Sequence, residues 1–113
     1  MPRGSIATID AETQRLTLIN LYEVEPANQA GLARLLSEIT DSVIRKEPGF
    51  ISVSVHSSVD GMKVVNYAQW ASKEHFEAFM KKPETRELLQ QFSALAKSVS
   101  PALYRVNSVH ADS

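Results

Sequence analysis

Two β-prone segments joined by a short turn limit the fold of this chain more than any other feature. Residues 50–57 (FISVSVHS) and 64–70 (VVNYAQW) flank an Asp-Gly dipeptide, which is typical of a hairpin turn. Because side chains alternate between the two faces of a strand, Asn66 and Trp70 share one face of the second segment. A buried amide without a hydrogen-bond partner costs about 1–3 kcal/mol, so this polar pair on a sheet wall suggests a ligand.

The other segments complete a β-α-β-β-α-β order. Residues 16–24 (LTLINLYEV) predict a strand covered on both faces, and apolar residues at three- and four-residue spacing after Pro26 predict a helix that ends at Pro48. A second helical region, interrupted at Pro83, precedes a last strand predicted over residues 102–109. This order predicts an α+β, ferredoxin-like fold with a four-stranded antiparallel sheet, whose first and third strands are central and run in parallel.

One face of the predicted sheet has no cover within a single chain. Two helical layers protect only one face, yet the first and third strands are apolar on both faces. The simplest partner is a second copy, packed sheet against sheet about a twofold axis. We therefore expect a homodimer, a dimeric α+β barrel, whose interface buries Ile19, Leu21, Tyr67 and Gln69. One pocket per protomer then lies between the sheet and its helices.

Size and charge bound the possible partners. The 113 residues suit one domain, predicted over residues 15–110 after a flexible N-terminal extension over residues 1–14. Twelve Lys and Arg against thirteen Asp and Glu give a net charge of −1, which offers no basic surface for nucleic acid or an anionic membrane. There is no cysteine, no histidine pair at metal-ligand spacing and no bilayer-length apolar run, so we expect a cytoplasmic protein without a bound metal.

Residues 49–79 resemble the antibiotic biosynthesis monooxygenase family, with the NYAQW-x-S stretch as the most characteristic part. The resemblance is closest to the small anthrone and quinol oxygenases and extends over residues 16–109. It implies a dimeric α+β barrel that uses molecular oxygen without metal, flavin or haem. It also implies that Asn66 and Trp70 act on the substrate and that His56 lies near the same pocket. A histidine within hydrogen-bond reach of the substrate is a candidate base.

Further pocket residues are expected from the first strand and the second helical region. Members close to the anthrone oxygenases have a tyrosine six residues after the tryptophan, where this chain has Phe76. A branch of the fold degrades haem with an Asn on the first strand, matched by Asn20, and with a Trp and a His, replaced here by Phe79 and Leu89. The missing axial ligand argues against haem degradation. We expect the substrate pocket to be lined by Asn20, Phe76, Phe79 and Leu89.

The sequence thus predicts a cofactor-independent monooxygenase that acts on a small aromatic substrate of the quinol or anthrone type, with Asn66, Trp70 and His56 as catalytic residues. Structural alternatives stay open for all three. In these alternatives, Trp70 is only a core side chain, Asn66 fixes a neighbouring loop, and His56 forms a hydrogen bond with Ser54 or with a backbone carbonyl. The functional alternative is a non-catalytic dimeric α+β barrel that binds a small ligand.

Overall fold

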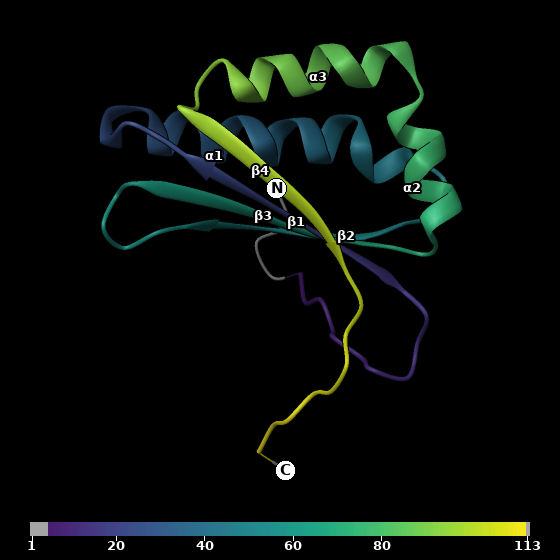
Figure 1. Cartoon of the computed structure of the whole chain (residues 1–113). Coiled ribbons are helices and arrows are strands. Elements are labelled where there is room, and N and C mark those ends of the chain that lie inside the picture. The colour runs from purple at the N-terminus through teal and green to yellow at the C-terminus, as the bar shows by residue number, and fades with distance from the viewer. Residues whose placement is uncertain (1–4, 113) are drawn as a thin grey trace.

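The computed structural model describes residues 5–112 and contains one four-stranded sheet with helices on one side (Figure 1). The elements are β1 (Leu16–Glu23), α1 (Pro26–Ser42), the 3-10 turn η1 (Ile44–Lys46), β2 (Phe50–Ser57), β3 (Lys63–Trp70), α2 (Lys73–Met80), α3 (Pro83–Ser93) and β4 (Ser98–Tyr104). The strands lie in the order β2-β3-β1-β4, and all neighbours are antiparallel. The predicted α+β, ferredoxin-like fold is therefore confirmed.

The predicted direction of the two central strands is wrong. β1 and β3 are central, as expected, but they run antiparallel, with Leu16 opposite Trp70 and Asn20 opposite Asn66. The chain passes from β1 through α1 to β2. The hairpin after β2 then reverses the chain direction, and β3 lies between β1 and β2. β1 is therefore parallel to β2, but the two strands do not pair, because β3 lies between them.

The last strand also differs from its prediction over residues 102–109. β4 spans Ser98–Tyr104, so Pro101 lies inside the strand rather than before it, and residues 105–109 form no strand. β4 is at the edge of the sheet, where Pro101 lies opposite Asn20 of β1. An edge strand tolerates proline because one of its two sides makes no ladder hydrogen bonds.

The helix starts follow the sequence signals. Pro26 and Pro83 open α1 and α3, where proline's fixed φ suits the first turn and its missing N–H would have no partner. Ser72 caps α2, since its Oγ accepts a hydrogen bond from the backbone N–H of His75 at 3.1 Å. Gly49 follows η1 at a φ of +84°, and a Cβ there would collide with the His75 ring, so the turn before β2 requires glycine.

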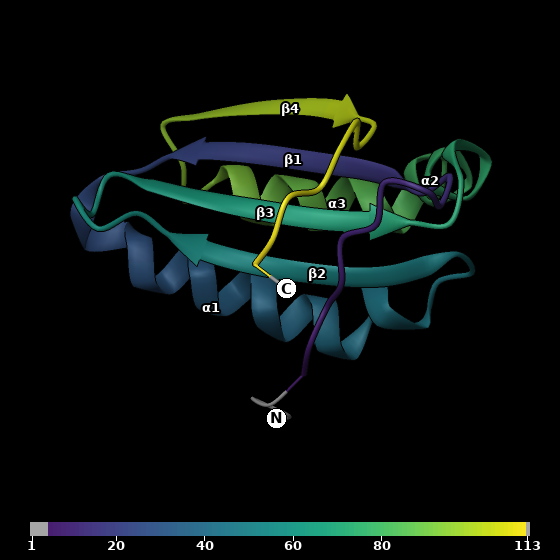
Figure 2. The ribbon, with the colours of Figure 1, turned by 90° about the horizontal axis from the view of Figure 1, so that it is seen from below.

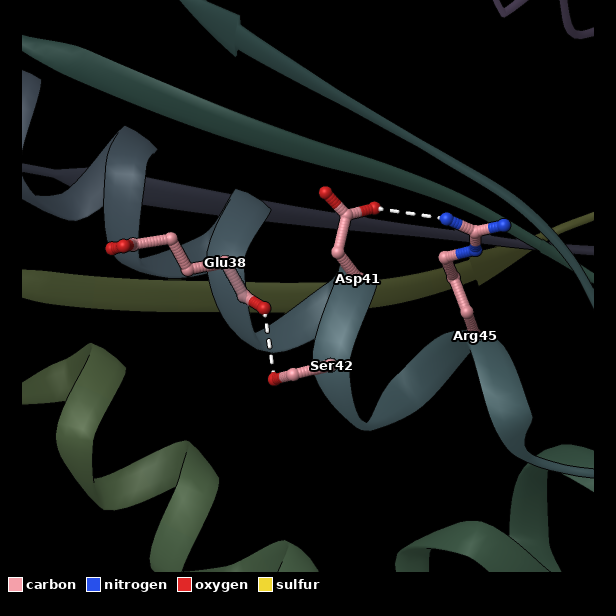
Figure 3. Close-up of polar contacts among 4 residues, drawn as sticks. All are labelled: Glu38, Asp41, Ser42 and Arg45. Atoms are coloured by element: carbon pink, nitrogen blue, oxygen red, sulfur yellow. Dashed lines mark hydrogen bonds and ion pairs between the residues drawn. The ribbon is translucent and has the colours of Figure 1, made fainter. Parts of the chain in front are cut away.

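The end of α1 lies earlier than the predicted Pro48. In the last turn, the Ser42 hydroxyl donates to the Glu38 carbonyl oxygen at 2.9 Å, and Arg45 pairs with Asp41 at 3.5 Å (Figure 3). Neither contact extends the helix: Ser37 makes the same bond to Ala33 within α1, and an exposed ion pair one turn apart contributes only about 0.3–0.5 kcal/mol. The chain leaves α1 here and continues through η1.

The two faces of the sheet have different covers. α1, α2 and α3 lie over one face, whereas the opposite face meets only the terminal segments (Figures 1 and 2). On that face the Gln69 side chain donates to the Thr8 carbonyl oxygen at 2.9 Å and to Ser52 Oγ at 3.0 Å. The part of the predicted N-terminal extension that the structure describes therefore touches the sheet. Residues 1–4 of that extension lie outside the described residues.

Within residues 5–112, no helix is both long enough and apolar enough to cross a bilayer. The cytoplasmic location and the domain bounds at residues 15 and 110 stay predictions.

Candidate active site

A cavity of about 330 Å³ lies between the helix-covered face of the sheet and the helices. All four strands and all three α-helices contribute to its wall, which is mainly apolar. Known small-molecule sites occupy about 300–1,000 Å³ and combine apolar walls with a few polar groups. The cavity has the size and the composition of such a site.

Six of the seven predicted site residues line this cavity. The two from the NYAQW stretch, Asn66 and Trp70, come from β3, and the four predicted pocket residues come from β1, α2 and α3: Asn20, Phe76, Phe79 and Leu89. The strand residues meet there because β1 and β3 are neighbours in register, with Asn20 directly opposite Asn66. Their functional roles stay predictions.

His56 is not brought to the cavity. It lies opposite Val65, whose side chain leaves β3 on the face opposite to that of Asn66, and it is exposed. Val55 occupies the position across from Asn66. The expectation that His56 lies near the pocket is therefore wrong for the described chain, because alternation along β2 turns this side chain away from the helices.

Trp70 is a core side chain and a cavity wall at once. It is 2% exposed, and Phe79 stacks on it with ring centroids 5.2 Å apart and planes 26° apart. Phe50 and Phe76 meet the indole edge-on at 6.1 and 6.0 Å. Phe50 reaches Trp70 because an irregularity in the β2–β3 register between Phe50 and Ser52 shifts the alternation of β2. Phe79 covers one face of the indole, so substrate contacts are limited to the rest of the ring.

Asn66 has an unsatisfied hydrogen-bonding group. Its Oδ1 is buried and has no hydrogen-bond partner within residues 5–112, although its residue lines the cavity. Leaving a buried acceptor unpaired costs about 1–3 kcal/mol, and such atoms in native proteins call for an explanation. A bound ligand that donates to this oxygen would recover that free energy, which favours a ligand-binding role over the loop-fixing alternative.

Tyr22 is a polar cavity residue that the sequence reasoning missed. It lies on β1 two residues after Asn20, on the same face, and is 2% exposed. Burial raises the pKa of the Tyr22 phenol to about 12, while a hydrogen bond with the Asn20 side chain partly opposes that rise. The alternation that identified Asn66 on β3 would have identified Tyr22 on β1.

Arg86 is the only charged side chain among the cavity-lining residues. It comes from α3, is exposed, and forms no ion pair within residues 5–112. No local sequence pattern identifies Arg86 as a site residue, because the placement of α3 over the sheet depends on tertiary packing. In the same range, no group of three or more His, Cys, Asp or Glu side chains is arranged to hold a metal ion.

Comparison with known proteins places this geometry in a family. Residues 15–98 match the family described as antibiotic biosynthesis monooxygenase. The chain is 40% identical over 95 residues to the tetracenomycin-F1 monooxygenase of Streptomyces glaucescens, covering 84% of this chain and 81% of that protein.

Solved structures agree with this comparison. The monooxygenase from the gene ActVA-Orf6 of Streptomyces coelicolor, solved with the ligand nanaomycin D, matches with a TM-score of 0.80 and 30% identity over 87% of this chain and 92% of the other. SnoaB from Streptomyces nogalater, a cofactor-independent oxygenase, matches with a TM-score of 0.76 over 86% of this chain and 97% of its own, and at 18% identity it supports the fold alone. The length of the family match, together with the identity and coverage of these relatives, shows that the chain belongs to the antibiotic biosynthesis monooxygenase family.

Proposed function

We propose that this protein is a monooxygenase that oxidises a quinol- or anthrone-type aromatic substrate with molecular oxygen and needs no metal, flavin or haem. The observation that carries the proposal is the apolar cavity of about 330 Å³, whose wall holds the Asn66 amide with its unpartnered oxygen. The relatives supply the reaction class, since one is a tetracenomycin-F1 monooxygenase and another is a monooxygenase that binds nanaomycin D.

In this reaction the substrate supplies the electrons. Removal of a proton from the quinol or anthrone gives an electron-rich anion, which passes one electron to dioxygen and forms a caged pair of substrate radical and superoxide. Their recombination makes a carbon–oxygen bond and gives a peroxide anion, which takes up a proton in place of the one lost in the first step. Loss of water from this hydroperoxide leaves a new carbonyl group. One oxygen atom enters the product and the other leaves as water. The protein has to exclude bulk water and to stabilise the anion.

The cavity provides groups for both tasks. Asn66 Nδ2 donates a hydrogen bond to the developing oxyanion, and Arg86, although its side chain is exposed, adds the one positive charge on the wall. The aromatic cluster of Trp70, Phe76 and Phe79 forms a firm wall at one end, against which the substrate rings lie. His56 has no part in this site within one chain.

The proposal is tested by oxygen uptake. Incubated with a panel of anthrones and hydroquinones, the protein is expected to consume oxygen faster than the buffer blank, and a metal chelator should leave that rate unchanged. Trp70→Phe should lower the rate about 2–10-fold, because aromatic contacts of this kind are worth about 0.5–1.5 kcal/mol. Met62→Leu, at an exposed position near the hairpin turn, is the matched control and should react like wild type.

Two outcomes would reject the oxygenase. Uptake equal to the blank for every compound, while the same compounds quench the fluorescence of Trp70, would identify a ligand-binding protein instead. Uptake that stops with the chelator and returns with added metal would reject the cofactor-independent reaction.

We also propose that the protein is a homodimer that pairs through the sheet face away from the helices. Ile19, Leu21 and Tyr67 on that face are only half-buried within one chain, and Tyr104 of β4 is 49% exposed beside them. Gln69, also expected at the interface, is already buried by its bonds to the N-terminal segment and Ser52. Burial of this apolar surface against a second copy would stabilise a sheet-to-sheet dimer.

Light scattering tests the dimer directly. Wild type at micromolar concentration should have twice the 12.5 kDa mass of one chain. Leu21→Asp should shift the mass toward one chain, because it places a charge in the middle of the interface. Val59→Asp, at a fully exposed position beside the hairpin turn, should stay dimeric. A wild-type mass of one chain would remove the interface.

A further inference from the structure

Asn20 and Tyr22 place polar groups on the helix-covered face of β1, where aliphatic side chains would be expected. They are 8% and 2% exposed, and both line the cavity. Their neighbours on this face include Leu18 of the same strand and Val64 of β3, so the pair lies in apolar surroundings. Burying a polar group in such a position costs free energy unless the group has a hydrogen-bond partner.

The pair lies beside Asn66 and extends away from Trp70. Asn20 is directly opposite Asn66, and Tyr22 is opposite Val64, two residues further along β3. At about 3.3 Å per residue, Trp70 lies roughly 13 Å from Asn66 along the strand in one direction, and Tyr22 roughly 7 Å in the other. The cavity therefore has an aromatic end at Trp70, an amide in the middle and a phenol at the opposite end.

The contact between the two residues leaves hydrogen-bonding capacity unused. The Asn20 side chain bonds to the Tyr22 phenol and lowers its pKa, which opposes part of the rise that burial causes. A phenol can both donate and accept, and Asn20 is its one hydrogen-bond partner within residues 5–112, so the group keeps a further position for a ligand. With a pKa of about 12, Tyr22 stays a neutral donor throughout the neutral pH range.

We propose that Asn20 and Tyr22 form a second polar subsite, which binds an oxygen substituent of the substrate other than the one that Asn66 contacts. The proposal concerns the same cavity and rests on its proposed function as a substrate site. It narrows the substrate class to ring systems that carry oxygen atoms at two separated positions. Sites built to hydrogen-bond a substrate oxygen discriminate strongly against analogues that lack it, so Tyr22 is a specificity-determining residue.

Ligand binding under argon tests the subsite without any turnover. The probes are 2-naphthol and 2,6-dihydroxynaphthalene, which differ by one hydroxyl at the far end of the ring pair, and the signal is the quenching of Trp70, the only tryptophan of the chain. Wild type should bind the diol about tenfold more tightly than 2-naphthol. Tyr22→Phe should abolish this preference by weakening the diol alone, and Asn20→Leu should reduce it.

The matched control for loss of a hydroxyl is Ser108→Ala, at an exposed position in the C-terminal segment, which should leave both affinities unchanged. Circular dichroism verifies folding, and Asn20→Leu serves as the test variant if Tyr22→Phe does not fold. The proposal is overturned if wild type binds the two probes equally or binds neither, or if the variants weaken both probes to the same extent. The binding test excludes oxygen and therefore does not depend on turnover. If the protein is not an oxygenase, the tenfold preference for the diol should still be seen, so failure of the proposed function is distinguishable from failure of the proposed subsite.

Discussion

Asn66→Ala is expected to lower kcat for oxygen uptake about 10²–10³-fold, the usual loss when one donor to a developing oxyanion is removed. The amide lies on the wall of a mainly apolar cavity, where its dipole acts at a low dielectric once a bound substrate has displaced water. The mutation also removes a buried oxygen that has no partner in the described chain, so the folded state should be no less stable. Steady-state kinetics with the most reactive hydroquinone or anthrone of the panel measures the effect.

The kinetic pattern separates catalysis from simple binding. KM should change much less than kcat, because the hydrogen bond strengthens as the charge develops in the transition state. Asn107→Ala, at an exposed position in the C-terminal segment, is the matched control for loss of an amide and should keep wild-type kinetics. A kcat within threefold of wild type for Asn66→Ala would show that this amide is not the oxyanion donor.

The wall of the cavity could be predicted from the sequence because it depends on local rules. Alternation along residues 64–70 and a hairpin turn at a fixed place put Asn66 and Trp70 on one face, and helical spacing put Phe76 and Phe79 on the side of α2 that meets it. These periodicities act within a few residues, so they hold without knowledge of the remaining chain. The helix starts at Pro26 and Pro83 were predictable for the same reason.

What the sequence did not show depends on contacts between distant segments. Whether Pro101 starts a strand or lies within one depends on β4 being an edge strand, which only the assembled sheet decides. Arg86 reaches the cavity because α3 packs over the sheet, and no local pattern encodes that position. For His56 the local rule was correct, since alternation along β2 placed it with Ser52 and Ser54 on the polar face, and the resemblance to relatives led to the wrong expectation.

Phe79→Ala is expected to lower the free energy of unfolding by about 3–5 kcal/mol, the range for truncating a buried phenylalanine. Phe79 is 7% exposed and stacks on Trp70, and the adjoining cavity gives the surrounding side chains few atoms with which to fill the space. Because stabilities of small domains are about 5–15 kcal/mol, this loss is a large part of the total. Urea titration followed by circular dichroism measures it.

The same variant tests how the indole is held. Removal of Phe79 opens one face of Trp70 to water, so the fluorescence maximum of the native protein should move to longer wavelength. Glu77→Ala is the matched control on α2, and because this side chain is exposed and does not line the cavity, its effect on stability should be within about 0.5 kcal/mol, with unchanged emission. A loss below about 1.5 kcal/mol for Phe79→Ala, or unshifted emission, would show that Trp70 keeps its environment without this contact. In that case Phe50 and Phe76, which contact the indole edge-on, would be sufficient to hold Trp70 in place.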